Sequence, residues 1–457
     1  MRVVLAACLL LSLPMSGRAA AGPTPTVIVD IHALGFDAVA SLKHADGVLW
    51  SAEFGNELLV GVDPVALPTW RSRKNVRAGP VLDFDEVLVS DHKRTLDVHE
   101  PALAVVGGYE ILRRSDRPAS AADGPQTSGR PLPVDGVFAR EIANEARRKG
   151  VALPARDIEN LIGRIDRDRW FDTMSALAAF NRNSFNPTLG LAHDWILQRF
   201  VDAGLEAQSF GFTMTASSAI CMPPPAAVQA ANPIGYKRGQ TLPDEWIIVG
   251  AHYDSRNAVL CETSANPSPQ PGANDNASGC AGVIELARVF APMATQRSVL
   301  FMCFAGEEQR SVGSNRYVTS LLNDGLLPRV KHMINLDMIG HAVDDTLTAR
   351  VETTPSHAAV LAAYADAAGT YAPELNLITT TQAINNSDHY PFLHIGVPGA
   401  FTWENGSGIY PHYHLSSDVP GNMLRARPLA HGILKMDAAR LAGLAGLLPL
   451  FSDGFGD

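Results

Sequence analysis

Apolar and polar residues follow two different patterns along the chain. From Val27 to about Arg113, short apolar runs such as "TVIVDI" and "ELLVGV" are separated by turn residues, which is typical of β-strands. From about residue 137 onward, helical patterns such as "LGLAHDWILQRFVDAGL" alternate with apolar runs such as "EWIIVGAHYDS" and "RSVLFMCFAGEE". This alternation predicts an α/β fold with a mixed, mainly parallel central sheet flanked by helices, preceded by a small β-rich N-terminal domain.

The segment between the two patterns is rich in Pro, Gly, Ser and Asp, which is the composition of a linker. We therefore expect a β-rich N-terminal region over 22–113, a linker over 114–136 and a second domain over 137–451. The second domain is expected to begin with helices in "GVFAREIANEARR" and "DIENLIGRIDRDRWFDTMSALAAF".

The first 21 residues have the pattern of a signal peptide. One basic residue precedes an apolar core from Val3 to Leu13, and Ala19 and Ala21 fit an A-x-A cleavage site. The apolar core is too short to span a bilayer. The stretch "LAAC" imitates a lipoprotein cleavage site, but the apolar run continues past it. We therefore expect a secreted or periplasmic protein without a membrane anchor.

The charge of the chain argues against polyanionic partners. The formal net charge is −10, and no basic block occurs anywhere along the chain. Nucleic acid or an anionic membrane surface is therefore not expected as the main partner.

The cysteines lack the C-x-x-C spacing of a metal site. Cys303 lies in an apolar run and Cys280 lies beside an apolar helix, so both are predicted to be buried thiols. Cys221 and Cys261 lie in Pro- and Ser-rich segments, and an oxidising compartment would allow them to form a disulfide.

Polar residues of the kinds that bind metal follow several of the predicted strands. Ligands of α/β sheets bind beyond the carboxyl ends of the strands. Histidine and carboxylate side chains without a cysteine suit Zn²⁺ or a similar divalent ion. The candidates are His252 and Asp254 in "GAHYDS", Asp275 in "GANDNASG", Glu307 and Glu308 in "FAGEEQRSVGS", Asp337 in "NLDMIG", and His412, His414 and Asp418 in "YPHYHLSSD".

Each of these signals is weak when taken alone. An aspartate in a Gly/Asn loop, such as Asp275, is commonly a turn former or a helix cap. Paired glutamates commonly begin a solvated helix. Asp337, inside an apolar strand pattern, needs a partner because burying a charge is costly. The joint occurrence at successive strand ends is what indicates a metal site.

In this order, the motifs resemble a known family. The series "GAHYDS", "GANDNASGCAGVIELAR", "FAGEEQRSVGS", "NLDMIG", "SDHYPF" and "YHLSSD" is similar to that of the secreted di-zinc aminopeptidases, a family that also includes glutaminyl cyclases and prostate carboxypeptidase-like proteins. The resemblance covers about Ile158 to Leu447. The region before about Val137 is not part of it.

The resemblance implies two Zn²⁺ ions per chain. His252 and Asp337 would hold one ion. Glu308 and His414 would hold the other, and Asp275 would bridge the two. His412, two residues earlier, aligns less well than His414 with the last ligand.

The resemblance also implies roles for residues that do not bind metal. Glu307 would act as general base on the attacking water and then protonate the leaving amine. Asp254 would accept the imidazole N–H of His252. Tyr413 would steady the oxyanion or simply pack, and Asp388 would support the site without binding metal.

The implied function is a secreted zinc aminopeptidase, a monomer, that hydrolyses the N-terminal peptide bond of peptides with a free N-terminus. The alternative on the same fold is a glutaminyl-peptide cyclotransferase with a single zinc ion. The N-terminal region would then be a pro-region or an accessory domain. Phe401 and Trp403 would line the specificity pocket, and the loop 256–270 could cap its entrance.

Overall fold

The computed structural model describes residues 22–31, 34, 36–55, 57–83, 86–90, 102–107, 109–113, 129–132, 136–141, 155–215, 226–257, 269–382, 387–404 and 410–448. The predicted signal peptide over 1–21 and the predicted Cys221–Cys261 disulfide lie outside these residues.

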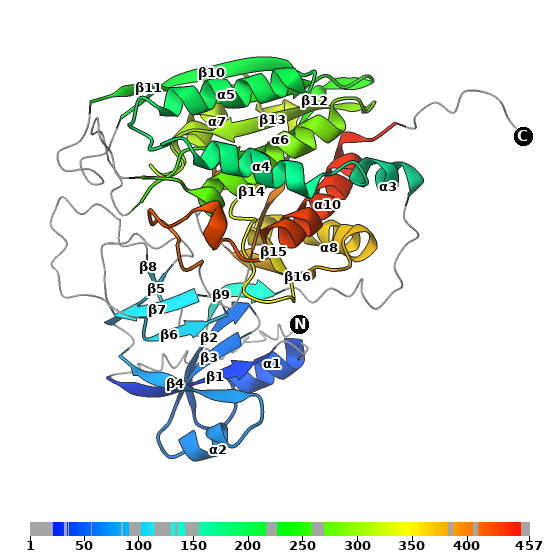
Figure 1. Cartoon of the computed structure of the whole chain (residues 1–457). Coiled ribbons are helices and arrows are strands. Elements are labelled where there is room, and N and C mark those ends of the chain that lie inside the picture. The colour runs from blue at the N-terminus through cyan, green and yellow to red at the C-terminus, as the bar shows by residue number, and fades with distance from the viewer. Residues whose placement is uncertain are drawn as a thin grey trace, which may run out of the picture.

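A mixed central sheet with helices on both faces dominates the fold (Figure 1), which confirms the predicted fold class. Strands β13, β12, β14 and β17 run parallel to one another, and β15 runs parallel to β16. The pairs β10–β11, β11–β13 and β15–β17 are antiparallel. In sheet order the strands of this part are β10 (Glu206–Met214), β11 (Val228–Lys237), β13 (Arg297–Phe304), β12 (Leu242–His252), β14 (Val330–Leu336), β17 (Gly399–Glu404), β15 (Thr348–Thr353) and β16 (Asn376–Gln382).

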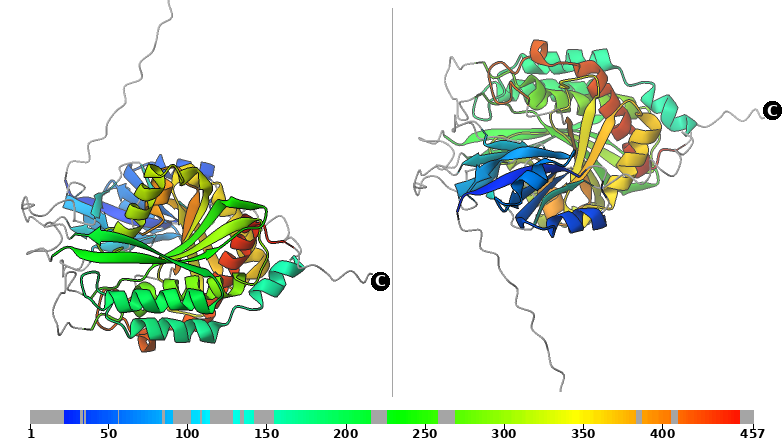
Figure 2. Two further views of the ribbon diagram at one scale, coloured as in Figure 1. Left: turned by 90° about the horizontal axis from the view of Figure 1, so that it is seen from above. Right: turned by 90° about the horizontal axis from the view of Figure 1, so that it is seen from below.

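Two hydrophobic cores, one on each face of this sheet, explain the uninterrupted apolar run of β13. Val299 and Phe301 belong to the larger core, whereas Leu300 and Met302 belong to the core on the other face. Successive strand residues point to opposite faces, so a strand covered on both sides has no polar positions. Figure 2 shows the sheet between its two helical layers.

The helices divide between these two cores. Helices α3, α4, α5, α6, α8 and α10 contribute to the larger core, and α7 and α9 contribute to the smaller one. None of the helices in the described ranges is both long and apolar enough to cross a membrane. Their bounds are α3 (Arg156–Ile162), α4 (Arg167–Ala178), α5 (Leu189–Asp202), α6 (Gly279–Phe290), α7 (Val312–Asn323), α8 (Val360–Tyr371), α9 (Tyr390–His394) and α10 (Ala426–Ala445).

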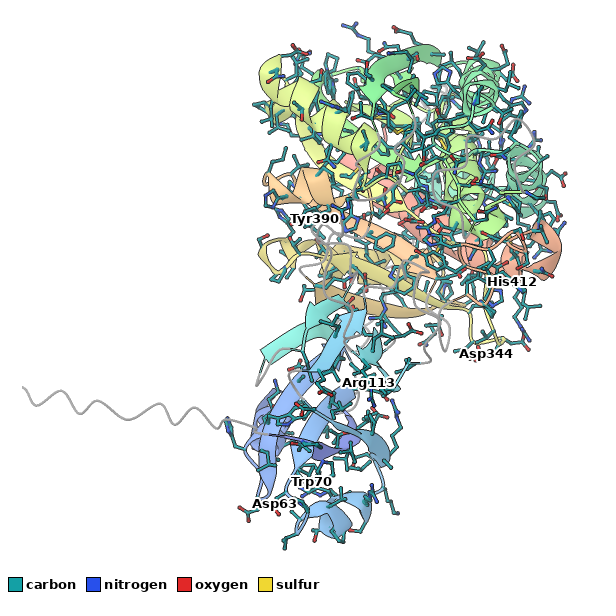
Figure 3. All side chains as sticks on the ribbon, turned by 90° about the vertical axis from the view of Figure 1, so that its left-hand side faces the viewer. Asp63, Trp70, Arg113, Asp344, Tyr390 and His412 are labelled. Carbon is teal, nitrogen blue, oxygen red and sulfur yellow. A yellow bond between two sulfur atoms is a disulfide. The ribbon has the colours of Figure 1, made fainter. Side chains whose placement is uncertain are left out.

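The N-terminal region is rich in β-structure, as predicted, and it forms a distinct lobe in Figure 3, where Asp63 and Trp70 lie far from His412. Its elements are β1 (Thr24–Asp30), α1 (Phe36–Lys43), β2 (Val48–Gly55), β3 (Glu57–Val62), α2 (Leu67–Arg71) and β4 (Val76–Leu82), followed by a small sheet of β5 (Val87–Ser90), β6 (Ala104–Val106), β7 (Tyr109–Arg113) and β8 (Gly129–Pro131). Strand β8 lies inside the range that the composition marks as a linker.

The two parts of the chain share one sheet. Residues Gly136–Glu141 form strand β9, which pairs antiparallel with β16 and parallel with β2. The described strands other than β5, β6, β7 and β8 thereby form one 13-stranded sheet that ends in β4 on one side and β10 on the other. The prediction of a helix in "GVFAREIANEARR" was wrong over Gly136–Glu141, because strand pairing on both sides outweighs the local helical preference of this segment.

A buried side-chain contact also connects the parts. The Tyr109 hydroxyl of β7 donates a hydrogen bond of 2.8 Å to Gln382 Oε1 at the end of β16, and both residues are buried. The Gln382 amide in turn donates to the fully buried Glu352 carboxylate of β15, which also accepts a bond from Thr380. Tyr109 of the N-terminal region is therefore connected to a buried carboxylate of the α/β part through Gln382.

The cysteine prediction needs one correction. Cys280 of α6 and Cys303 of β13 are fully buried, as expected, but they form a disulfide rather than two thiols. Helix α6 packs directly on β13, and the two Cα atoms lie 6.1 Å apart, within the range that a disulfide can bridge. This proximity arises only in the folded chain, since 23 residues separate the two cysteines in sequence.

Removing the hydroxyl that joins the two parts should weaken the folded state. We expect Tyr109→Phe to lower the free energy of unfolding by about 1 kcal/mol, because a buried hydrogen bond is lost and Gln382 is left with an unmet acceptor. Urea denaturation would measure the change. The control is Tyr371→Phe, whose hydroxyl accepts a bond from the Ala155 amide at the surface and should cost less. Equal effects of the two variants would contradict a buried role for Tyr109.

Candidate metal centre and active site

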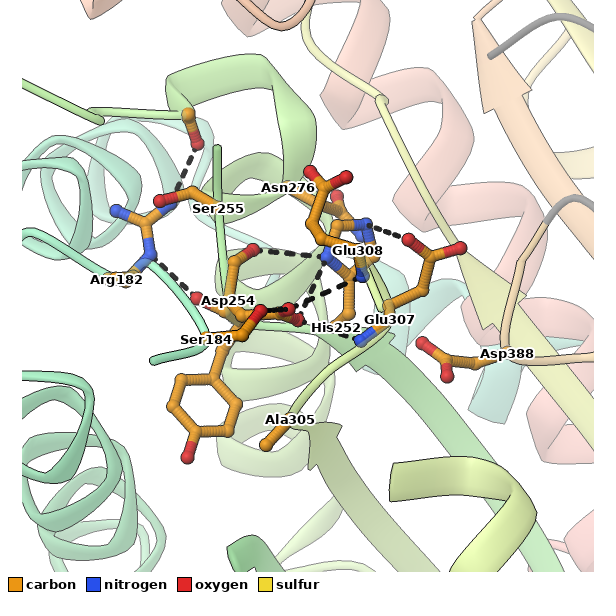
Figure 4. Close-up of polar contacts among 12 residues, drawn as sticks. Arg182, Ser184, His252, Asp254, Ser255, Asn276, Ala305, Glu307, Glu308 and Asp388 are labelled. Atoms are coloured by element: carbon orange, nitrogen blue, oxygen red, sulfur yellow. Dashed lines mark hydrogen bonds and ion pairs between the residues drawn. The ribbon is translucent and has the colours of Figure 1, made fainter. Parts of the chain in front are cut away.

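The candidate site lies at the carboxyl ends of three adjacent parallel strands, β13, β12 and β14. His252 is the last residue of β12, Asp337 directly follows β14, and Glu307 and Glu308 follow β13 after two residues. Parallel strands carry their chain ends to the same edge, so residues far apart in sequence meet there (Figure 4).

Asp275 lies between two histidines and is the centre of the site. Its Oδ1 atom is 3.1 Å from Nε2 of His252, and its Oδ2 atom is 3.0 Å from Nε2 of His414. A second carboxylate approaches each histidine: Asp337 Oδ1 is 3.3 Å from His252 Nε2, and Glu308 Oε2 is 3.3 Å from His414 Nε2. The five predicted ligands therefore form two groups of three donor atoms that share Asp275.

The donor spacing fits tetrahedral zinc. Zn–N and Zn–O bonds of about 2.0–2.1 Å place neighbouring donors about 3.3 Å apart around a tetrahedral ion. Each imidazole Nε2 faces two carboxylates but carries at most one hydrogen, so a hydrogen bond can satisfy only one of them. Glu308 Oε1 is buried and makes no hydrogen bond. His252, Asp275 and Glu308 also offer one ligand atom each within 4.8 Å of one another.

Hydrogen bonds fix the backbone around Asp275, the residue shared by the two donor groups. The buried carboxylate of Asp418 accepts hydrogen bonds from the amides of Asn274 and Asp275, at 2.9 and 3.0 Å. The Asn276 side chain accepts from the amide of Met338 and donates to the carbonyl of Leu336, at 3.1 and 3.0 Å. Burial raises the pKa of Asp418 to about 7, although the two amides act in the opposite direction. Asp418 thus contributes by orienting the chain rather than as a donor to the site.

The paired glutamates have different surroundings. Gly306 ends the β13 run with φ of 73°, a left-handed conformation, and a Cβ there would lie 2.6 Å from the Met214 sulfur. This turn brings Glu308 to the His414 group, while Glu307 Oε2 stays 3.9 Å from His252 Nε2. Glu307 is therefore beside the donor groups without the spacing of a ligand.

Asp254 contacts the glutamates more closely than it contacts the histidine. Its carboxylate accepts hydrogen bonds from the amides of Glu307 and Glu308, at 3.0 and 3.3 Å, and from the Ser184 hydroxyl, at 2.6 Å. The nearest acceptor for His252 Nδ1 is the main-chain oxygen of Asp254, at 3.1 Å, whereas the carboxylate is 3.6 Å away. The H-x-D spacing alone does not reveal which oxygen faces the ring.

The remaining predicted residues surround the centre. Asp388 is fully buried beside Glu307 (Figure 4) and accepts a bond of 2.5 Å from the Ser314 hydroxyl. Burial raises the pKa of Asp388 to about 7. The ring of Tyr413 stacks on the imidazole of His414, with ring centroids 3.7 Å apart.

Three aromatic rings form a stack near this end of the sheet. Phe401 and Trp403 of β17 lie parallel with ring centroids 6.0 Å apart, and His389 stacks on Phe401 at 4.9 Å. All three are buried. Of the loop predicted to cap the entrance, residues 258–268 lie outside the described residues.

The sequence analysis missed several residues that hold the site. Ser387 donates a hydrogen bond of 2.6 Å to Asp337 Oδ2, and Ser184 and Arg182 lie on the same side of Asp254, away from Glu307 (Figure 4). Single serines and arginines carry no spacing pattern, so no signal in one sequence distinguishes them from surface residues.

Comparison with known proteins finds a family match for part of the chain. Residues 233–434 match peptidase family M28. A protein of Pyrenophora teres f. teres described as a probable zinc metalloprotease is 30% identical over 230 residues, which are 48% of this chain and 46% of that protein. Aminopeptidase YwaD of Bacillus subtilis is 30% identical over 193 residues, which are 41% of this chain and 39% of that protein. The chain thus spans about half the length, or less, of these curated relatives.

Solved structures share the fold. The aminopeptidase from Aneurinibacillus sp. strain AM-1 has a TM-score of 0.52 at 17% identity, over 65% of this chain and 98% of that one. LapB from Legionella pneumophila has a TM-score of 0.52 at 17% identity, over 93% and 100%. The glutaminyl cyclase of Macrostomum lignano has a TM-score of 0.53 at 14% identity, over 66% and 97%. The matched segment contains all five predicted ligands, and we conclude that residues 233–434 are similar to peptidase family M28 and that the chain resembles proteins described as zinc metalloproteases and aminopeptidases.

Proposed function

We propose that the protein is an exported aminopeptidase that uses two zinc ions to hydrolyse the N-terminal peptide bond of peptides. The observation that carries this proposal is the placement of Asp275 between His252 and His414, with Glu307 beside the shared donors. Export rests on the signal-peptide pattern of residues 1–21.

The chain offers three donors for each of two ions. His252 and Asp337 with one oxygen of Asp275 would hold the first, and His414 and Glu308 with the other oxygen would hold the second. When bound, two such ions polarise the scissile carbonyl and lower the pKa of water toward neutrality.

Glu307 supplies the proton transfers. Its carboxylate is nearly buried, lies 3.9 Å from His252 Nε2, and belongs to neither group of close donors. In this role it accepts a proton from the attacking water and later gives it to the leaving amine. The hydrogen bond from its amide to Asp254 keeps its backbone fixed during both transfers.

The surroundings suit a free N-terminus. A protonated α-amine is attracted to a site lined by several carboxylates, and Asp388 adds a carboxyl group beside Glu307. The stack of Phe401 and Trp403 provides apolar surface near the same strand ends, suited to an N-terminal side chain.

Metal content tests the two-ion proposal and separates it from the cyclase alternative. We expect about two Zn²⁺ per chain in the active protein, because Asp275 offers one oxygen to each histidine group. Elemental analysis of the purified protein measures this number, and removal by a chelator should abolish hydrolysis of an aminoacyl anilide. One tightly bound ion in a fully active preparation, together with cyclisation of an N-terminal glutaminyl peptide, would favour the single-zinc cyclase.

Replacing each of the two neighbouring glutamates by glutamine should impair different properties of the enzyme. Glu307→Gln keeps the shape but cannot take the proton, so kcat should fall by about 10²–10⁴ or more while KM and metal content change little. Glu308→Gln removes an anionic ligand, so one metal ion should bind more weakly and excess Zn²⁺ should restore part of the activity.

Each glutamate variant is the control for the other, since the residues are adjacent and the substitution is the same. Steady-state kinetics and metal analysis of both variants decide the roles. Loss of a metal ion in Glu307→Gln, with both ions kept in Glu308→Gln, would show that the roles are reversed. Changes of only a few-fold in both variants would mean that neither residue belongs to the catalytic machinery.

A further inference from the structure

A buried polar segment, residues 182–184, precedes the family-matched part of the chain and forms hydrogen bonds with the loops that carry site residues. Arg182, Asn183 and Ser184 follow the end of α4 and are almost completely inaccessible to solvent. The match to peptidase family M28 begins only at residue 233. None of the three touches the five donor residues directly through the contacts described for them, so their relation to the site passes through intermediate groups.

Arg182 binds main-chain carbonyls from three separate stretches. Its Nε donates to the oxygen of Tyr253 at 2.7 Å, and its Nη1 donates to Leu177 at 2.7 Å and Pro271 at 2.8 Å. Its Nη2 donates to the oxygen of Gly272 at 2.8 Å. A planar guanidinium has the fixed set of donors that such an arrangement requires. One side chain thereby connects the end of α4 to the loop after His252 and the loop before Asp275.

Arg182 also places a buried positive charge near the carboxylates of the site. Burial lowers the pKa of Arg182 to about 10, while Asp418, Asp254, Asp275 and Glu308 act to raise it. The guanidinium therefore remains charged at neutral pH. Its described hydrogen bonds all go to carbonyls, so it offsets the repulsion among these carboxylates without pairing with any of them.

Ser184 contacts the carboxylate on which the paired glutamates depend. Its hydroxyl donates to Asp254 Oδ2 at 2.6 Å, and that carboxylate accepts the amides of Glu307 and Glu308. The amide of Ser255 donates to the Arg182 carbonyl at 3.0 Å, which fixes the next residue of the same loop. The contacts thus run from the 182–184 segment through Asp254 to both glutamates.

We propose that Ser184 and Arg182 are positioning residues that hold Asp254, and through it Glu307 and Glu308, in the arrangement that binds metal and transfers the proton. The inference rests on the proposed aminopeptidase function. The hydrogen bonds of this segment converge on the site. Ser184 bonds the Asp254 carboxylate, and two of the four Arg182 hydrogen bonds go to the loop that leads to Asp275.

Ser184→Ala tests the proposal with the smallest structural change. Loss of the hydroxyl leaves Asp254 with fewer donors, so we expect zinc affinity to fall about 10–100-fold, as when a group that orients a metal ligand is removed. We expect kcat to fall by a similar factor, since small displacements of a catalytic group are costly, while KM stays within about twofold. Competition with a chromophoric zinc chelator measures affinity without any substrate.

Ser298→Ala is the matched control. Ser298 is equally buried and bonds Pro243, Gly239 and Tyr236, but it lies at the start of β13, the opposite end of the strand from the site. This variant should lose comparable thermal stability with zinc affinity and kcat unchanged. Wild-type zinc affinity and kcat in Ser184→Ala, or the same losses in Ser298→Ala, would overturn the proposal.

Arg182→Lys tests the second member of the segment. Lysine keeps the positive charge but cannot reach four carbonyls from three stretches, so we expect losses of zinc affinity and kcat at least as large as in Ser184→Ala. A folded Arg182→Lys protein with wild-type zinc affinity would show that Arg182 is not required for positioning. Should this variant fail to fold, Ser184→Ala still decides the proposal for Ser184.

The zinc measurement also separates this inference from the proposed function. If the wild-type protein binds zinc but hydrolyses no aminoacyl substrate, the aminopeptidase proposal is wrong, and weaker zinc binding in Ser184→Ala would still support the positioning role. If the wild-type protein is an active aminopeptidase and Ser184→Ala matches it in zinc affinity and kcat, only the positioning inference is wrong.

Discussion

The sharing of one carboxylate by two imidazoles is the constraint on which the rest of the site depends. Asp275 places an oxygen 3.1 Å from His252 and another 3.0 Å from His414, and each histidine also faces a second carboxylate. Buried carboxylates at this density repel one another unless cations or hydrogen-bond donors compensate them. Asp418 accepts a hydrogen bond from the amide of Asp275 and so fixes its backbone. The buried guanidinium of Arg182 interacts electrostatically with several of these carboxylates.

The parallel strands β13, β12 and β14 explain why the polar residues meet at one edge. Most of their buried side chains are apolar because helices cover both faces, and the residues that form the site come at or just after the carboxyl ends of the strands. Beyond the ends, a left-handed Gly306 turns the chain and presents Glu307 and Glu308 together. The same strand order leaves β16 at the other side of the α/β part, where β9 of the N-terminal segment pairs with it.

The N-terminal lobe is joined to the α/β part through main-chain pairing and through the bond from Tyr109 to Gln382. Removal of this region would leave the edge of β16 unpaired and would take away the hydrogen bond that Gln382 accepts from Tyr109. LapB of Legionella pneumophila matches 93% of this chain in fold, an extent that includes the N-terminal lobe in part.

The sequence by itself determined the fold class and the strand ends that carry polar residues, because buried strands and helices leave periodic patterns. The choice of the five donors and of Glu307 came from the resemblance of the ordered motifs to a known family. Tertiary structure decided what has no local pattern. Residues 137–141 became a strand because β2 and β16 offered pairing partners, and Cys280 met Cys303 because α6 packs on β13. It also decided that Asp254 faces the amides of Glu307 and Glu308, and that Ser184 and Arg182 lie beneath them. Such contacts join residues tens of positions apart, and their geometry exists only once the chain is folded.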